Sequence, residues 1–481
     1  RFYNSGRGQI IEKNGQKYLN GQLPDIDLDV SEKQRQIIID YLRNKWKHVV
    51  KMATFNTLGP RAAIKDGGRA FGLDFDEANL ISNLIPKIPA NLSLTEALDI
   101  SQPLKEYRNK YPELFDIALQ LEGTRRNTGV HAAGIILSNE KIDENIPMLY
   151  HAKSKTSIVG LEMQSVEDIG LQKIDILGLK TIDVIEDATN IIREKNPNFD
   201  SYDLNLNDSK TWEMICNKHI VGIFQCDSDV GIKVLDKVMP SNLEELSQVI
   251  TLQRPACLVN GVNSVLEKYY RVKFGKESQK YLIDELIPIL KNTYGVIIYQ
   301  EQILEIFNKI AGFTLEESDK CRHSIGKKQI KELEAFKEQF IKNIENKYNI
   351  KVAKELWEMI VNSALYIFNK SHSIAYAMIT YITAYLKTHY PLEFFISMLR
   401  NSDNEAESLF EINKLVNDCK KFRIPIYKPE LRLNNIDFQI EDKGIRYGLK
   451  YIKNLGTTAI SKMSKNKFNY NNYSDQLQFF I

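Results

Sequence analysis

The sequence has few cysteines, no long apolar run and almost no excess of charge of either sign. Its five cysteines stand singly, with no CxxC pair: Cys216, Cys226, Cys257, Cys321 and Cys419. This pattern excludes a disulfide framework and a cysteine-based zinc site, and it predicts a reducing, cytoplasmic location. No apolar run approaches the roughly 20 residues that a membrane span needs, so we expect a soluble protein with no membrane partner. A net charge of +2 neither demands nor excludes a polyanionic partner.

Length and composition predict a globular chain of several domains. With 481 residues, 43% of them hydrophobic and 26% charged, the chain is neither disordered nor fibrous. At roughly 150 residues per domain, about three domains are expected. Because the sequence begins with Arg1 rather than Met and ends on DQLQFFI, we expect an internal piece of a longer protein.

An acidic strand is the first feature that indicates chemistry. In PDIDLDV, residues 24 to 30, polar and apolar residues alternate, so Asp25, Asp27 and Asp29 share one face of a strand. Carboxylates about 7 Å apart on one face repel each other, and a bound cation relieves that repulsion. An all-oxygen site suits Mg²⁺ or Mn²⁺.

A second strand, LQKIDILGL, adds a single carboxylate and a lysine. Lys173 and Asp175 lie two residues apart and therefore share a face. Together with Asp27 and Asp29 they have the composition that two-metal phosphoryl transfer requires. An exposed strand with solvated acids would show the same Asp-x-Asp pattern, and this alternative stays open at the level of the pattern.

Basic residues occur in two segments of the text between these strands. We expect a helix from Ser31, its N-cap, to Val50, and helices throughout residues 56 to 132. Arg61, Lys65 and Arg69 are four apart on a helix starting near Pro60, with a Gly67-Gly68 pair that would end it early; the stripe suits a phosphate backbone or is a solvated face. EGTRRNTGVHAAG places Arg125, Arg126 and His131 around a turn that either contacts an anion or is simply charged.

Two further segments of the chain carry basic residues near helix ends. In DKCRHSIGKK, Arg322, His323, Lys327 and Lys328 surround Gly326, which favours anion binding. In FNKSHSIAYAM, the Asn-Lys-Ser-His opening suggests a phosphate site at a helix N-terminus. The tyrosines that follow at helical spacing are more typical of core packing than of base stacking. IKNLGTTAISKM, residues 452 to 463, has the form of half a helix-hairpin-helix.

Taken together, seven segments in order resemble the C family of replicative DNA polymerases, the α subunits of bacterial DNA polymerase III. The segments are PDIDLDV, TFNTLGPRAAIKDGGRAFG, HAAGIILS, GLQKIDILGLKT, FQCDSDVGIKVL followed by LQRPACL, TYGVIIYQEQI with RHSIGKK, and FNKSHSIAYAMITYITAYLKTHYPLEF. The resemblance implies that Asp27, Asp29 and Asp175 are the catalytic carboxylates and hold two Mg²⁺ ions, with Mn²⁺ as a substitute. Asp25 would be a neighbour and not a ligand.

The resemblance also implies nucleotide and DNA contacts. The nucleotide set comprises Lys173, Arg322, His323, Asn369, Lys370 and His372, and we assign DNA binding to Arg61, Lys65, Arg69, Arg125, Arg126 and Arg254. The family usually has a second arginine where this chain has His323, which lacks the bidentate fork, so weaker triphosphate binding is expected. The family's Arg-Pro-Gly-Pro turn is replaced here by Arg-Pro-Ala-Cys from Arg254 on.

The implied fold is α+β and mostly helical, with a palm sheet similar to that of polymerase β-like nucleotidyltransferases. The palm would comprise residues 1–55 and 133–179, the thumb 56–132 and the fingers 180–400. Residues 401–481 would open the clamp-binding region with its helix-hairpin-helix. The implied partners are primer–template DNA, dNTPs, an N-terminal PHP and palm portion, a sliding clamp and other replisome subunits.

The expected activity is template-directed addition of dNMP to a primer 3′-hydroxyl. Because neither the family's PHP domain nor its Gly-Ser-rich phosphate loop is found upstream of PDIDLDV, we expect this chain to need that N-terminal part for activity. One alternative is a non-catalytic DNA-binding or assembly protein of the same fold, although such a protein has no reason to keep clustered carboxylates. Another is a metal-dependent phosphohydrolase, for which the segments after residue 180 would have no use.

Overall fold

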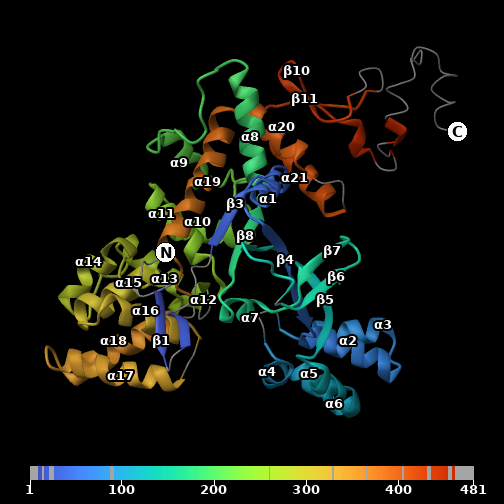
Figure 1. Ribbon diagram of the computed structural model, residues 1–481. Helices are drawn as coiled ribbons and strands as arrows, with labels where there is room; N and C mark the ends of the chain where they lie inside the picture. Colours follow the sequence, from blue (N-terminus) through green and yellow to red (C-terminus); the bar gives the residue numbers. More distant parts are fainter. Residues whose placement is uncertain are drawn as a thin grey trace, which may run out of the picture. The chain divides into compact units, whose positions relative to one another are not determined.

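The computed structural model describes most of the chain (Figure 1). The chain forms two compact units. The described residues are 9–13, 16–20, 26–86, 92–144, 146–258, 261–327, 330–364, 366–402, 406–430, 435–452, 455 and 458–460. One unit, the sheet unit, runs from Ser5 to Leu179, and the other, the helical unit, from Lys180 to Ile481. Asp25, Lys328 and most of the expected helix-hairpin-helix lie outside the described residues, as do the side chains of His323 and Lys327.

The sheet unit is built on a six-stranded mixed sheet in the order β3-β8-β5-β4-β7-β6. Its strands are β3 Ile26–Val30, β4 His48–Thr57, β5 Arg125–Ser138, β6 Met148–His151, β7 Thr156–Val159 and β8 Gln172–Gly178. β3 pairs with β8 in parallel, whereas β5 is antiparallel to both of its neighbours. A separate hairpin is formed by β1 Gln9–Lys13 and β2 Gln16–Asn20. The two strands predicted from PDIDLDV and LQKIDILGL are thereby confirmed.

Apolar side chains cover both faces of this sheet. On one face, Ile39 of α1 Arg35–Lys45 packs against Ile135 and Ile176. On the other, Val166 of α7 Met163–Asp168 packs with Met52 and neighbouring residues. Alternation of side chains along β4 and β5 explains why these two strands contribute to both cores.

The expected helix from Ser31 to Val50 is shorter than predicted. It begins at Arg35, because Ser31 Oγ accepts from the Gln34 backbone N–H at 3.1 Å and closes a turn instead of capping the helix. It ends at Lys45, and β4 begins at His48. The β-branched and apolar residues of HVVKMATF pair into the sheet, which overrides their helical reading.

A helical insertion joins β4 to β5, and Figure 1 shows its helices gathered beyond the ends of these two strands. The helices are α2 Pro60–Phe71, α3 Phe75–Asn83, α4 Leu94–Ile100, α5 Gln102–Lys110 and α6 Pro112–Leu121, around their own core. The expectation of helices throughout 56–132 is wrong at both ends, because β4 reaches Thr57 and β5 begins at Arg125.

The Gly67-Gly68 pair does not end α2, contrary to expectation. A Cβ on Gly67 would lie 3.4 Å from Leu114 Cδ1 of α6, and one on Gly68 would lie 3.2 Å from Ala78 Cβ of α3. The glycines therefore permit close approach of neighbouring helices. The helix ends at Gly72, whose positive φ of 82° closes it.

The helical unit packs its helices around two apolar cores. Its helices are α8 Lys180–Arg193, α9 Ser209–Cys216, α10 Asp229–Val238, α11 Leu243–Leu252, α12 Pro255–Leu258, α13 Val265–Lys273, α14 Ile287–Leu290, α15 Gln300–Glu305, α16 Leu315–Lys327, α17 Ile330–Glu345, α18 Ile350–Ser363, α19 Lys370–His389, α20 Pro391–Arg400 and α21 Ala406–Lys421. Short elements complete it: 3-10 turns Gly261–Asn263, Asp284–Leu286, Lys291–Thr293 and Leu449–Tyr451, a π-helical turn Ile306–Ile310, and strands β9 Ile426–Tyr427, β10 Gln439–Glu441 and β11 Gly444–Arg446. Among the described helices, none is long and apolar enough to cross a bilayer.

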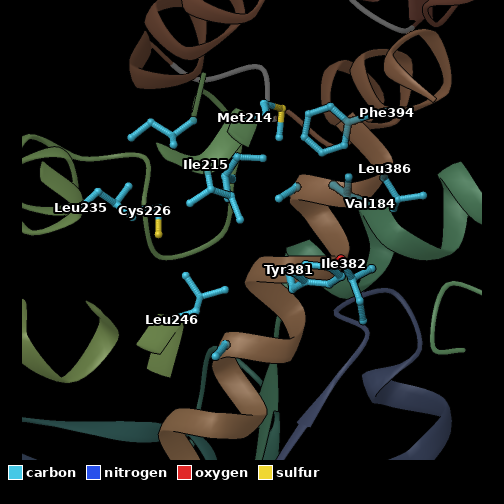
Figure 2. Close-up of a cluster of buried hydrophobic side chains, with 14 of the residues drawn as sticks. Val184, Met214, Ile215, Cys226, Leu235, Leu246, Tyr381, Ile382, Leu386 and Phe394 are labelled. Carbon is cyan, nitrogen blue, oxygen red and sulfur yellow. The ribbon is translucent and has the colours of Figure 1, made fainter. Parts of the chain in front are cut away.

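Helix α19 is the centre of the larger core (Figure 2). Side chains of α8, α9, α10, α11 and α20 belong to the same cluster as Tyr381, Ile382 and Leu386 of this helix. Tyr381 is fully buried and donates its hydroxyl to the Asn205 carbonyl at 2.7 Å. The interpretation of the tyrosine stripe as core packing is confirmed for this residue.

A buried ion pair fixes α19 to its surroundings. Lys387 Nζ lies 2.7 Å from Asp418 Oδ2 of α21, and the two side chains are 0% and 1% exposed. The ammonium also donates to the carbonyls of His219 and Val221, at 2.8 and 2.7 Å. Burial lowers the pKa of Lys387, and the Asp418 carboxylate opposes that shift. The three N–H donors of the Lys387 ammonium thus each have an oxygen partner, which stabilises the buried charge.

Replacing Lys387 by Met should destabilise the helical unit by about 3–5 kcal/mol, because Asp418 would lose the cation that is buried with it. The matched control is Lys421→Met, which removes the other cation near Asp418; that side chain is 62% exposed, so a loss below about 1 kcal/mol is expected. Urea unfolding followed by circular dichroism measures both. Equal losses in the two variants would show that the buried pair has no special role.

Candidate active site

The candidate site lies on one face of the sheet unit, where β3 pairs with β8. In this parallel register Asp27 stands opposite Asp175, and Asp29 stands opposite Leu177. In-register partners direct their side chains to the same face, and alternate residues of a strand share a face. The pairing thus brings the three carboxylates to neighbouring positions. Asp27 is exposed, Asp29 is half-buried, and the Asp175 side chain is 14% exposed.

Lys173 is the counter-charge of Asp175. Its Nζ lies 2.9 Å from Asp175 Oδ2 and 3.5 Å from the sulfur of Met163. The lysine side chain is only 8% exposed. The other oxygen, Asp175 Oδ1, is buried and has no hydrogen-bond partner among the described residues; His131 Nδ1 is 3.8 Å away. A buried carboxylate oxygen without a donor is a costly arrangement unless a cation or donor binds it.

A bulge in β5 shapes the wall beside Asp175. Lys51 pairs with Ile135 and Ala53 with Val130, so β5 has extra residues at this point. Within the bulge His131 Nδ1 accepts backbone N–H groups of Gly134 at 2.6 Å and Ala133 at 3.3 Å. Because Nδ1 is an acceptor, the ring proton resides on Nε2. The expected turn at Arg125, Arg126 and His131 is therefore a strand with a bulge.

Gly134 is required by this arrangement. A Cβ there would lie 2.8 Å from His131 Nδ1 and 3.2 Å from Asp175 Oδ1. Gly134 also pairs with Asp175 across the antiparallel β5–β8 ladder. The glycine lets the β5 backbone and the imidazole approach the carboxylate closely.

The residues present fit a hard divalent cation by their chemistry. In the part of the chain that the structure describes, no three His, Cys, Asp or Glu side chains lie close enough together to hold one metal ion. The three carboxylates nevertheless offer only oxygen donors, which Mg²⁺ and Mn²⁺ prefer. The undonated Asp175 Oδ1 is an acceptor suited to such a cation.

The basic stripe of α2 does not form one exposed face. Arg61 donates to the Ile85 carbonyl at 2.6 Å and is half-buried, so it anchors the end of α3. Lys65 is also half-buried. Arg69 is exposed and pairs with Asp66 at 2.8 Å. The helix predicted from the i,i+4 spacing is confirmed. The neighbouring helices partly bury Arg61 and Lys65, however, so only Arg69 of the three is exposed.

The two arginines at the start of β5 are exposed and paired with acids. Arg126 lies 3.1 Å from Asp66, which thereby joins it to Arg69 of α2. Arg125 lies 2.5 Å from Glu162 and 4.7 Å from the centre of the Phe55 ring. Arg69 and Arg126 are thus brought together around one carboxylate.

In the helical unit, five predicted contact residues gather around one backbone bridge. Tyr299 and Phe368 pair in parallel, and the Gln300 N–H donates to the Phe368 carbonyl at 2.9 Å. The candidate nucleotide and DNA contacts follow Phe368 in the chain or touch Tyr299, Gln300 or Phe368 through their side chains. These are Arg254, Arg322, Asn369, Lys370 and His372.

Each of these side chains has a partner within the unit. Arg254 lies over the Phe368 ring at 4.1 Å, and the His372 ring stacks on Tyr376 with centroids 4.2 Å apart. Asn369 caps α19 by accepting the His372 backbone N–H at 2.9 Å, which is a structural role.

Two cations of this cluster are paired with acids. Arg322 binds Asp319 through Nε and Nη2, at 3.0 and 2.8 Å, and Gln300 through Nη1 at 3.3 Å. Lys370 Nζ lies 2.7 Å from Glu244 Oε1. The guanidinium and the ammonium are thereby oriented before any ligand binds.

Sequence reasoning missed Arg35, whose guanidinium links two strands beside the carboxylates. Arg35 of α1 donates through Nε to the Ile176 carbonyl at 2.7 Å and through Nη2 to the Ala132 carbonyl. The small residues of HAAG were a readable signal, because glycine inside a strand pattern marks a bulge or a close approach. Nothing in the text around Arg35 distinguishes it from the exposed arginine of the same helix, Arg43.

Comparison with known proteins gives consistent matches. The model of the bacterial DNA polymerase III alpha NTPase domain matches residues 17–178, and that of the bacterial DNA polymerase III alpha subunit finger domain matches residues 181–348. The chain is 33% identical to DNA polymerase III subunit alpha of Aquifex aeolicus over 92% of its own length. It is 34% identical to the corresponding proteins of Borreliella burgdorferi and Bacillus subtilis, over 92% and 94% of its length. The chain spans about 40% of the length of these relatives.

The fit around Gly134 can be tested by a double-mutant cycle on stability. Gly134→Ala should cost about 1–3 kcal/mol, because the new Cβ would meet the His131 ring. In a His131→Ala background the same change should cost at least about 1 kcal/mol less, since the clash is gone. Urea unfolding of the four proteins measures the coupling. The same cost in both backgrounds would show that the imidazole is not what the glycine accommodates.

Proposed function

The chain belongs to the family of bacterial DNA polymerase III alpha subunits, and on this premise we propose that it performs template-directed DNA synthesis. The reaction is addition of a dNMP to a primer 3′-hydroxyl with release of pyrophosphate. The observation that carries the proposal is the grouping of Asp27, Asp29 and Asp175 on one face of β3 and β8, with the buried Asp175 Oδ1 lacking a hydrogen-bond donor.

Asp27, Asp29 and Asp175 are the residues proposed to hold two Mg²⁺ ions, with Mn²⁺ able to replace them. When bound, such ions lower the pKa of the attacking hydroxyl and neutralise charge on the leaving pyrophosphate. Lys173 is the proposed triphosphate contact from the same face. Its pairing with Asp175 supports this role, because the ammonium already binds a carboxylate oxygen. A phosphate oxygen is an acceptor of the same kind and would compete for this ammonium.

Arg322, His323, Asn369, Lys370 and His372 are proposed to contact the incoming nucleotide. Asn369 would act indirectly, since its side chain is engaged in capping α19. The pairing of Arg322 and Lys370 with Asp319 and Glu244 supports the proposal, because both cations are oriented in advance.

The proposed DNA contacts are Arg61, Lys65, Arg69, Arg125, Arg126 and Arg254. Exposure favours Arg69, Arg125 and Arg126 for direct phosphate contact. The half-buried Arg61 and its carbonyl partner favour a supporting role.

The proposed organisation assigns palm to 1–55 and 133–179, thumb to 56–132, fingers to 180–400 and the start of a clamp-binding region to 401–481. The division of the chain between Leu179 and Lys180 supports the palm–fingers boundary. The helices inserted between β4 and β5 support a thumb. The proposed partners are primer–template DNA, dNTPs, an N-terminal PHP and palm portion, a sliding clamp and other replisome subunits, in the cytoplasm.

Asp175→Asn should reduce single-nucleotide primer extension on the order of 10²–10³-fold while DNA binding stays nearly unchanged, because the metal site and not the fold is lost. The assay uses Mg²⁺ and this chain, alone and with an N-terminal PHP–palm piece of a related polymerase. Asp143→Asn, an exposed acid of the same unit, is the matched control and should retain full activity.

Activity of the unmodified protein only in the mixture would support the need for that N-terminal part. No extension in either case, with DNA binding retained, would favour the non-catalytic alternative. Hydrolysis of nucleotides without a primer would favour the phosphohydrolase.

His323→Arg should lower the KM for dNTP several-fold at unchanged kcat, since a guanidinium adds roughly 1 kcal/mol of charge-assisted hydrogen bonding to a triphosphate. Steady-state primer extension over a range of dNTP concentrations measures this change. The control is His323→Gln, which adds no charge and should leave KM within about twofold. An unchanged KM in His323→Arg would remove this position from the nucleotide set.

A further inference from the structure

We propose that Arg35 is a positioning residue that sets the carboxylate face for metal binding; the proposal rests on the proposed function. Arg35 is the first residue of α1, the helix that follows β3. Its guanidinium donates to the carbonyl of Ile176 at 2.7 Å and to the carbonyl of Ala132. Ile176 adjoins Asp175 in β8, and Ala132 lies inside the β5 bulge.

This one side chain therefore connects the three strands that shape the site. β3 carries Asp27 and Asp29 and leads into Arg35 through a short turn. β8 carries Asp175, and the β5 bulge presents His131 and Gly134 to it. A displacement of β8 relative to α1 or to the bulge would change the position of Asp175 Oδ1 relative to the oxygens of β3 and to His131. A fixed guanidinium opposes that displacement because its donors are rigidly spaced.

The bulge in β5 lacks the backbone pairing with β4 that the rest of the strand has. Ladder pairing between β4 and β5 jumps from Lys51–Ile135 to Ala53–Val130, so residues 131 to 134 have no partner residue in β4. Arg35 supplies a donor to the Ala132 carbonyl in place of the interrupted ladder.

We expect α1 to remain packed when this contact is removed. Helix α1 packs on the opposite face of the sheet through Ile39, with Ile38 and Leu42 beside it. Removal of the Arg35 guanidinium should therefore leave this apolar packing in place and loosen the bulge. Positioning and folding can be separated by experiment for this reason.

The test compares the unmodified chain with Arg35→Met, Arg35→Lys and a matched control, Arg43→Met. Arg43 lies on the same helix, is 44% exposed and, in the part of the chain that the structure describes, pairs with Asp40 alone. The first readout is hydrogen exchange by mass spectrometry. In Arg35→Met, peptides covering Arg125–Ser138 and Gln172–Gly178 should exchange about tenfold faster, while the rest of the sheet unit keeps its rates.

The second readout is Mn²⁺ affinity of the protein without DNA or nucleotide, measured by electron paramagnetic resonance. Arg35→Met should weaken it roughly 10–100-fold, as outer partners of metal ligands typically do, and Arg35→Lys should recover part of the loss. Arg43→Met should match the unmodified chain in both readouts.

Three results would overturn the inference: unchanged exchange in both peptides, uniformly faster exchange across Ser5–Leu179, or unchanged Mn²⁺ affinity in Arg35→Met. If Arg35→Met does not fold, Arg35→Lys decides by the same two criteria. Failure of the unmodified chain to bind Mn²⁺ would instead contradict the proposed function, and the local exchange result would still report whether Arg35 holds the bulge.

Discussion

The parallel pairing of β3 with β8 in one particular register is the constraint on which the candidate site depends. It puts Asp27 opposite Asp175, and two carboxylates on the same face of neighbouring strands repel each other. Lys173 offsets part of this repulsion through Asp175. A slip of one residue would send the acids of β3 to the apolar face, so burial of Ile176 and Ile39 on that face selects the register that crowds the charges.

Pairing of cations with acids recurs at the candidate contacts in both units. Arg322 with Asp319, Lys370 with Glu244, and Arg69 and Arg126 with Asp66 show the same arrangement. These pairs explain how a chain with a net charge of only +2 can still offer positive groups to a polyanion. The acids orient the cations, and phosphates at the proposed contacts would have to displace them. The net affinity for phosphate would then fall as ionic strength rises.

Local patterns predicted the elements that carry the acids. Period-two alternation identified β3, and the apolar residues on both sides of Asp175 identified β8. The two-residue spacing put Lys173 on the face of Asp175. The register between the strands was beyond a local pattern, because it depends on residues far apart in the chain. For the same reason Glu244 could not be assigned to Lys370, whereas Asp319 lies three residues from Arg322 on one helix and was within reach of an i,i+3 argument.

The misread segments have a common physical cause. The start of β5 was expected to be helical and to form a turn, whereas it is a strand with a bulge that contains Ala132, Ala133 and Gly134. Small residues are present there because neighbouring groups approach closely, and this close approach is visible only in three dimensions. Gly67 and Gly68 were misjudged in the same way: close helix packing, and not a helix end, explains them.

The order in which the chain is made gives the β3–β8 pairing another consequence. Arg35 and Ile176 are 141 residues apart, so a growing chain has completed α1, β4 and all of α2–α6 before β8 is available. Long-range pairing of this kind forms late and slowly. Until β8 pairs with it, both backbone edges of β3 are unpaired. The like charges of this acidic strand discourage pairing with the same strand of another copy. The repulsion between carboxylates that is unfavourable in the folded site thus disfavours aggregation of the chain during its synthesis.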